Sequence, residues 1–220
     1  MRRNLIYWVS VLVMSIVVSK SVAEAGIQSV AGGLNAPASA LGPYTMSSFN
    51  DDLRLTSKKY SYVESPLTGN VEFYLPLEHQ EISSGWITWS HGYNGDVYWT
   101  SGDEYFVTLT LPVWTSAFYF YAEPKNVEVY EIVADAYDEL NNIVQISQDV
   151  KGDFGACYYG FYGTDGSVIK NINIYSDEPF AIGEFGISMI PAPEAFLLCN
   201  IGLCTVMELK RRGIFEQNKV

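Results

Sequence analysis

The sequence predicts an all-β protein, an antiparallel β-sandwich of jelly-roll-like topology with an apolar segment at each end of the chain. Aromatic residues make up 15% of the 220 residues, and aromatic side chains favour strands. Short strand-like runs recur about every 8–12 residues and are separated by Gly, Asn, Asp and Pro, a spacing typical of sandwiches and barrels. The middle of the chain has few Leu-rich helical patterns.

The composition divides the chain into four parts. In order, we expect a signal peptide over 1–25, a flexible leader over 26–59, a β-sandwich ectodomain over 60–190 and an anchor over 191–220. The leader is assigned because 26–43 is rich in Gly, Ala, Ser and Pro, and because 44–65 is polar and ambiguous, with a first strand late in it.

The first 25 residues have the three regions of a secretory signal. Arg2 and Arg3 form a basic start, 5–18 is apolar, and the A-x-A sequence that ends at Ala25 is a cleavage site. We therefore expect a mature chain that begins at Gly26. The alternative is an uncleaved N-terminal membrane helix, for which the apolar run is short.

The first strands of the ectodomain are predicted from turn signals. The run 71–75 is stopped by Pro76, and 86–90 follows a Ser-Ser-Gly turn. The dipeptide Asn94-Gly95 is a strong hairpin signal and leads into a strand over 96–100.

The later strands are predicted from side-chain periodicity. In 105–111, Val107 and Leu109 share one face with period two; 116–122 is nearly all bulky and indicates a central strand covered on both faces. A strand over 127–137 competes with a helix and is favoured by its β-branched and aromatic content. The remaining runs are NIVQISQDV, ACYYGFYG, VIKNINIYS and FAIGEFGIS, and GTDG between the second and third is a hairpin turn.

The charge of the chain excludes one class of partner. Its formal net charge is −12, and the part from Gly26 to Pro193 holds 21 acidic and 6 basic residues. Such a surface repels phosphate groups, so we expect no nucleic-acid partner. High net charge also favours solubility.

The C-terminal tail predicts a membrane anchor. Fifteen mostly apolar residues, 195–209, would form a helix of about 22 Å. This is short for a hydrocarbon core of about 30 Å, but Lys210, Arg211 and Arg212 follow it and their side chains extend its reach. Basic residues stay on the cytoplasmic side, which places the ectodomain outside. The alternative is a helix docked on the domain, and apolar residues on every side argue against it.

The order of Pro-Glu motif, short apolar helix and basic cluster resembles the PEP-CTERM sorting signal. Pro193 and Glu194 match the first two positions of the family's Pro-Glu-Pro, and Ala195 stands where the second Pro is expected. The resemblance implies recognition by an exosortase in the inner membrane, with delivery to the cell surface or the extracellular polysaccharide matrix. The stretches HGYNGDVYWT, VTLTLPVWTSAFYFYAEP and FAIGEFGIS are similar to the β-rich ectodomain of many PEP-CTERM proteins.

No catalytic residue, metal site or cofactor is predicted. Ser90 and His91 are adjacent, so in a strand their side chains would face opposite sides. The acidic group of Asp96, Asp103 and Glu104 lacks the EF-hand pattern. Three cysteines show no metal or redox spacing.

Aromatic residues around one predicted hairpin are the candidate carbohydrate contacts, because a flat ring can stack on a sugar. We single out Trp99, Tyr98 and Trp89. Trp86 and Trp89 are three apart and would face opposite sides of a regular strand, and core packing is the competing interpretation for each.

Together these features predict an exported, non-enzymatic cell-surface or matrix protein that contacts extracellular polysaccharide. The alternative is a secreted carbohydrate-active enzyme with a dispersed carboxylate pair, which a pair of carboxylates in an aromatic cleft would favour.

Overall fold

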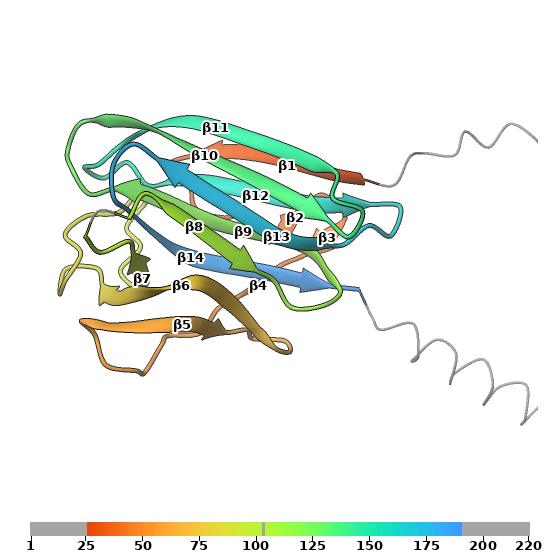
Figure 1. The fold of residues 1–220 in the computed structure, drawn as a ribbon, viewed down its shortest axis with the longest axis horizontal. Coiled ribbons are helices and arrows are strands. Elements are labelled where there is room, and N and C mark those ends of the chain that lie inside the picture. Colours follow the sequence, from red (N-terminus) through yellow and green to blue (C-terminus); the bar gives the residue numbers. More distant parts are fainter. Residues whose placement is uncertain (1–25, 103, 191–220) are drawn as a thin grey trace, which may run out of the picture.

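The computed structural model describes residues 26–102 and 104–190, and all regular elements among them are strands (Figure 1). The strands are β1 (Gly26–Gly33), β2 (Ala40–Leu41), β3 (Tyr44–Thr45), β4 (Ser47–Ser48), β5 (Lys58–Glu64), β6 (Asn70–Glu81), β7 (Asp96–Trp99), β8 (Phe106–Thr110), β9 (Thr115–Pro124), β10 (Val129–Asp138), β11 (Ile143–Lys151), β12 (Cys157–Thr164), β13 (Ile169–Ser176) and β14 (Phe180–Met189). The signal peptide and the C-terminal anchor lie outside the described residues.

The main sheet is antiparallel throughout and folds into two layers. Its order is β1-β12-β9-β14-β7-β6-β8-β13-β10-β11, with β4 beside β14 and β5 beside β6. The first five strands form one layer and the last five form the other, and β9 of the first layer contacts β10, β11 and β13 of the second. The predicted all-β antiparallel sandwich is confirmed.

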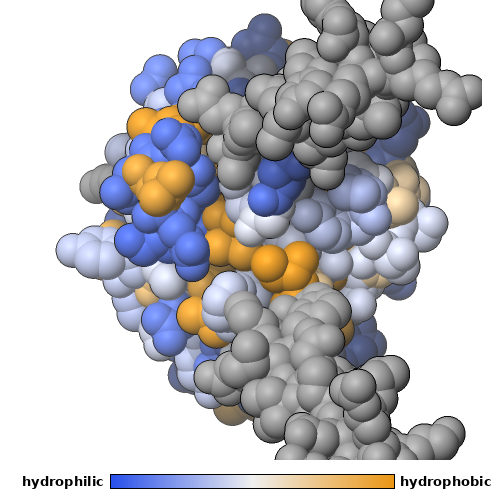
Figure 2. Space-filling model, turned by 90° about the vertical axis from the view of Figure 1, so that its right-hand side faces the viewer, coloured by the Kyte–Doolittle hydropathy of each residue, from blue (hydrophilic) through white to orange (hydrophobic). Residues whose placement is uncertain are grey.

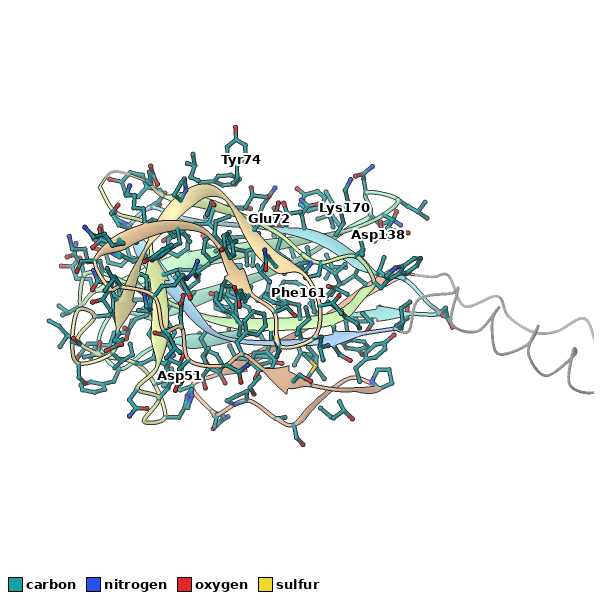
Figure 3. All side chains as sticks on the ribbon, turned by 90° about the horizontal axis from the view of Figure 1, so that it is seen from below. Asp51, Glu72, Tyr74, Asp138, Phe161 and Lys170 are labelled. Carbon is teal, nitrogen blue, oxygen red and sulfur yellow. The ribbon has the colours of Figure 1, made fainter. Side chains whose placement is uncertain are left out.

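The inner core lies between the two layers and follows the period of the strands. Val107 and Leu109 point into it from β8, and Phe118 and Phe120 from β9. Figure 3 shows Phe161 of β12 in the same interior. The prediction that 116–122 is a central strand is confirmed, since every residue of β9 is buried. The strand predicted over 127–137 is confirmed as β10, and its helical alternative is excluded.

A second core covers the outer face of the β9 layer and comes from irregular segments. Tyr119 and Tyr121 of β9 pack there with Leu41 of the leader, and with Trp86 and Trp89 of the segment between β6 and β7. The layer therefore has apolar contacts on both faces, although the sandwich has only two layers of strands.

The prediction of a flexible leader over 26–59 is wrong. Strand β1 pairs with β12 in a regular register from Gly26 opposite Thr164 to Ala31 opposite Tyr159. Most of its side chains are exposed, so backbone hydrogen bonding rather than side-chain burial defines this strand. Its Gly and Ala content, which is depleted in strands, concealed it in the sequence.

One strand boundary, at Pro76, also differs from prediction. Pro76 lies inside β6 rather than ending a strand, because the register against β5 jumps from Tyr60 opposite Leu77 to Tyr62 opposite Glu72. Proline is tolerated at such an irregularity, where its missing N–H breaks no ladder bond. Tyr74 points outward from this part of β6 (Figure 3).

The run 86–90 is not a strand, and the Asn94-Gly95 hairpin is replaced by a longer loop. Residues 82–95 join β6 to β7, which pair with each other from Glu78 opposite Trp99 to Glu81 opposite Asp96. GTDG does form a turn, in which the Ser167 N–H donates to the Thr164 carbonyl at 3.0 Å and Asp165 and Gly166 have positive φ. It is not the predicted hairpin, because β12 and β13 lie in different layers and do not pair with each other.

Candidate functional site

A pocket of about 320 Å³ opens at the end of the sandwich where β7 and β9 end. This volume lies in the range of small-molecule sites. Its lining residues come from β6, the loop after it, β7, the end of β9, the β9–β10 turn and the β11–β12 turn: Gln80, Gly85, Trp86, Ile87, Thr88, Trp99, Glu123, Pro124, Lys125, Val127, Gly152 and Asp153.

Two tryptophans form the aromatic part of the pocket. Trp99 is the last residue of β7 and is half-buried. Trp86 is 8% exposed and is held by a tight turn in which its N–H donates to the Glu81 carbonyl at 3.1 Å. The two ring centroids are 6.1 Å apart with an interplanar angle of 51°. The turn brings together two indoles that sequence periodicity alone does not pair.

A buried carboxylate forms the floor of the pocket. Glu123 is fully buried on the outer face of β9. Its oxygens accept hydrogen bonds from Trp86 Nε1 at 2.7 Å, from Gly155 N at 3.0 Å and from Thr88 Oγ1 at 3.2 Å. Burial raises the pKa of Glu123, and the three donors oppose this by favouring the charged form. Glu123 therefore fixes the Trp86 ring and two loops in one arrangement.

The pocket also contains one cationic side chain and one buried indole donor. Lys125 Nζ lies 5.0 Å from the centroid of the Trp99 ring, a cation–π contact on one face of that indole. Trp99 Nε1 is buried and has no hydrogen-bond partner among the described residues. An indole N–H can only donate, and a buried donor without an acceptor is uncommon in folded proteins.

Of the predicted carbohydrate contacts, Trp99 lines this pocket and the other two do not. Tyr98 is 1% exposed and stacks between His79 and Phe185 in the inner core. Trp89 is 2% exposed in the outer core. Neither ring offers a face to a ligand, so those two predictions need correction. The sequence contained no signal that would choose Trp86 over Trp89, because the choice depends on the turn.

Ser90 and His91 form a hydrogen-bonded chain with Glu184, contrary to the expectation that they face opposite sides. Ser90 Oγ lies 2.8 Å from His91 Nδ1, and His91 Nε2 lies 2.8 Å from Glu184 Oε1. His91 has a φ of +41°, which turns its side chain out of the strand-like alternation. Ser90 is 2% exposed, and His91 Nδ1 also lies 3.2 Å from the Leu34 carbonyl. These hydrogen bonds join the loop between β6 and β7 to the leader, and we assign them this structural role.

Glu184 reaches the outer face through a β-bulge. The register of β14 against β9 shifts between Gly183 and Gly186, and Glu184 has a φ of +51°. Regular alternation would put its side chain in the inner core with Ile182; the bulge puts Phe185 there instead. Burial raises the pKa of Glu184, while hydrogen bonds from His91 and Trp89 lower it.

A second pocket, of about 260 Å³, is relevant to the hydrolase alternative because three carboxylates line it, those of Asp51, Asp96 and Glu184. Asp96 accepts from the backbone N–H of Asp52 at 2.6 Å and lies 2.6 Å from His79 Nε2. Both oxygens of Glu184 are likewise engaged by side chains of the protein. A glycosidase carboxylate must offer an oxygen to the substrate or to water, so we assign no hydrolysis to Asp96 and Glu184.

The acidic group of Asp96, Asp103 and Glu104 can be examined as a metal site only in part, because Asp103 lies outside the described residues. Asp96 is committed to His79, and the described parts of the chain hold no cluster of three His, Cys, Asp or Glu arranged for a metal ion. In residues 26–102 and 104–190, no helix has the length and apolar character needed to span a bilayer. The sorting-signal residues Pro193, Glu194, Lys210, Arg211 and Arg212, and Ala25 of the cleavage site, lie beyond these ranges.

Comparison with known proteins gives distant structural likenesses and nothing closer. No known protein family and no curated protein matches the chain. A family 61 carbohydrate-binding module in complex with β-1,4-galactotriose is 12% identical over 51% of this chain and 82% of its own, with a TM-score of 0.33. A family 29 module from Piromyces equi is 10% identical over 76% and 92%, with a TM-score of 0.28.

A third solved structure is the enzymatically active domain of tailspike protein 4 from bacteriophage CBA120. It is 13% identical over 78% of this chain and 20% of its own, with a TM-score of 0.25. All three scores are too low to support an argument about function, which therefore depends on the geometry of the pocket.

Proposed function

We propose that the protein binds carbohydrate, without catalysis, in the pocket between Trp86 and Trp99. One observation carries the proposal: two tilted indoles, those of Trp86 and Trp99, line one pocket with ring centroids 6.1 Å apart. A sugar ring offers C–H groups to an indole face. Thr88, Lys125 and Asp153 add hydrogen-bonding groups around the same opening.

The charge of the protein indicates which carbohydrate it would prefer. The part from Gly26 to Pro193 holds 21 acidic and 6 basic residues, and Lys125 is the one Lys or Arg among the lining residues of the described pocket. An anionic polysaccharide would be repelled by the body as a whole. We therefore propose an uncharged extracellular polysaccharide as the ligand.

The test is binding of a glycan panel, followed by titration calorimetry on the best ligand. Trp99→Ala should weaken binding about tenfold, equal to about 1.4 kcal/mol, because it removes the exposed stacking surface. Tyr74→Ala is the matched control, since Tyr74 is 76% exposed on β6. Equal affinities for the two variants would contradict the site, and release of reducing ends would contradict the non-enzymatic assignment.

We further propose that the protein is exported by its N-terminal signal and sorted by its PEP-CTERM-like tail, with an exosortase-type enzyme as a processing partner. Support comes from the sequence at both ends of the chain. The expected destination is the inner membrane and then the cell surface or extracellular matrix. Fractionation of expressing cells tests this: a full-length protein confined to the cytosol would contradict it, as would unchanged localisation after deletion of 195–220.

A further inference from the structure

One end of the sandwich carries both ends of the described chain and four turns. Gly26 of β1 pairs with Thr164, and Met189 of β14 pairs with Thr115. Figure 1 shows β1 beginning and β14 ending on the same side of the molecule. The turns β5–β6, β8–β9, β10–β11 and β12–β13 lie at this end, which we call the terminal end. The Trp86–Trp99 pocket lies at the other end, where β9 finishes.

Large apolar side chains at the terminal end are exposed on three neighbouring turns. Leu67 is 43% exposed, and Val113 and Leu140 are each 76% exposed. Figure 2 views this end of the molecule and shows hydrophobic residues grouped near its centre. A groove of about 340 Å³ runs beside Val113 and Trp114 and is lined mostly by apolar residues.

The turn that carries Val113 and Trp114 is strained and lies next to the point where the chain leaves the sheet. Trp114 has a φ of +69°, a left-handed conformation that is unfavourable for a residue other than glycine. Its carbonyl accepts the Ile190 N–H at 3.0 Å, and Thr115 Oγ1 donates to the Pro112 carbonyl at 2.6 Å. These bonds hold a half-buried indole beside Ile190.

The tail limits how far this end can lie from a membrane. The apolar run begins at Ala195, five peptide steps after Ile190, which span at most about 18 Å when fully extended. The headgroup layer on each side of a bilayer occupies about 5–7 Å of that distance. If the run is inserted, little chain remains to hold the terminal end away from the lipid.

We propose that the terminal end rests on the headgroup region of an uncharged phospholipid bilayer while residues 191–220 remain attached. The inference depends on the membrane anchor proposed above. Tryptophan and exposed aliphatic side chains suit that interface. The contact is apolar rather than electrostatic, because Glu64, Glu139 and Asp165 are exposed at this end together with Lys170.

The alternative to a bilayer is that the tail of the same chain fills the groove. The sequence of the tail argues against this alternative. The run 195–209 is apolar on every side, so docking one side on the groove would leave the others in water. A bilayer covers all sides at once.

The experiment uses the mature chain in phosphatidylcholine vesicles that contain brominated acyl chains, with tryptophan fluorescence as the readout. Vesicle flotation is measured on the same samples. Trp114→Phe should lose the part of the bromine-dependent quenching that comes from Trp114, and Val113→Glu should reduce quenching in the Trp114-containing chain. Val129→Glu is the matched control, because Val129 is 61% exposed at the opposite end; it should leave quenching unchanged.

The outcomes separate this inference from the proposal of an anchor. If the chain floats with vesicles but Trp114→Phe is quenched as strongly as the parent, the anchor stands and the inference is wrong. If the chain does not float at all, both fall. Adding phosphatidylserine should weaken the quenching because of the acidic residues nearby, and a stronger quenching would overturn the apolar contact.

Discussion

The two faces of β9 differ in chemistry and in what covers them. The inner face presents Phe118, Phe120 and Ala122 to the opposite sheet. The outer face presents Tyr119, Tyr121 and Glu123, and irregular segments of the chain cover it. Both faces are buried, and the outer one carries two tyrosine hydroxyls and the Glu123 carboxylate.

The difference shows how an irregular cover is held on a sheet. Tyr121 donates to the Asn35 carbonyl, and Tyr44 of the leader donates back to the Gly163 carbonyl at 3.0 Å. The Glu123 carboxylate holds two further loops by accepting hydrogen bonds from Thr88 Oγ1 and from the Gly155 N–H. Strand alternation is enough to build the inner core, whereas specific hydrogen bonds fix the outer one, and the candidate sugar pocket lies in that outer layer.

The largest effect is expected from Phe120→Ala, which tests the packing of the inner face of β9. Phe120 is fully buried and stacks on Tyr159 with ring centroids 5.1 Å apart. Removing it should lower the free energy of unfolding by about 3–5 kcal/mol, the usual cost of truncating a buried aromatic. Urea denaturation measures this; a loss below about 1 kcal/mol would mean that the two sheets are not packed as described.

Glu123→Gln should have the next largest effect and should alter the pH dependence. An amide would leave one of the three donors without an acceptor, at a cost of about 1–3 kcal/mol. Because burial raises the folded-state pKa of Glu123 above its ordinary value of 4.5, the contribution of Glu123 to wild-type stability falls as the pH rises from 4.5 through the folded pKa and is then constant.

Glu123→Gln lacks this contribution, so the stability of the parent minus that of the variant should decrease over the same pH range. Glu184 has the same sign of effect and is present in both proteins, so the subtraction removes it. Denaturation at a series of pH values measures the difference. A difference that increases with pH would show that the Glu123 carboxylate is stabilised, not destabilised, by its site.

The smallest effect is expected from Tyr121→Phe, which tests the hydrogen bonding on the outer face of β9. The variant keeps the buried ring but removes the bond to the Asn35 carbonyl, at a net cost of about 0.5–1.5 kcal/mol. The loss should be local, so limited proteolysis should cleave 34–46 faster while the global transition moves little. Tyr60→Phe is the control, since its hydroxyl bonds to the exposed Leu55 carbonyl. Equal cleavage of the leader in both variants would contradict the proposed role of Tyr121.

The sequence predicted the parts of the fold that depend on alternation. The strands β8, β9 and β10 follow directly from their patterns, and so does the presence of a turn at Asp165, although not the hairpin predicted there. The leader was missed because β1 is defined by backbone pairing and has few buried side chains. No local pattern records a partner 138 residues away, such as the one that Thr164 finds in Gly26.

The site was predicted only at Trp99. Trp86 reaches the pocket through a turn, Glu123 through the outer register of β9, and Lys125 through the turn that follows. Trp86 comes from one segment and Glu123 and Lys125 from another, and the two segments meet only when the chain has folded. Tyr98 and Trp89 were plausible by composition, but burial decides between an aromatic ligand contact and an aromatic core residue, and burial is set by tertiary packing.

The length of β9 has a consequence for how the molecule meets its surroundings. Ten residues in a strand span about 33 Å, and β9 runs from the end near Ile190 to the end with the tryptophans. At physiological ionic strength this is about four screening lengths. If the molecule is held at the end near Ile190, counterions screen the charge of the cell envelope almost completely at the end with the tryptophans. Glycan strands could then reach that end without crossing the layer of counterions at the envelope.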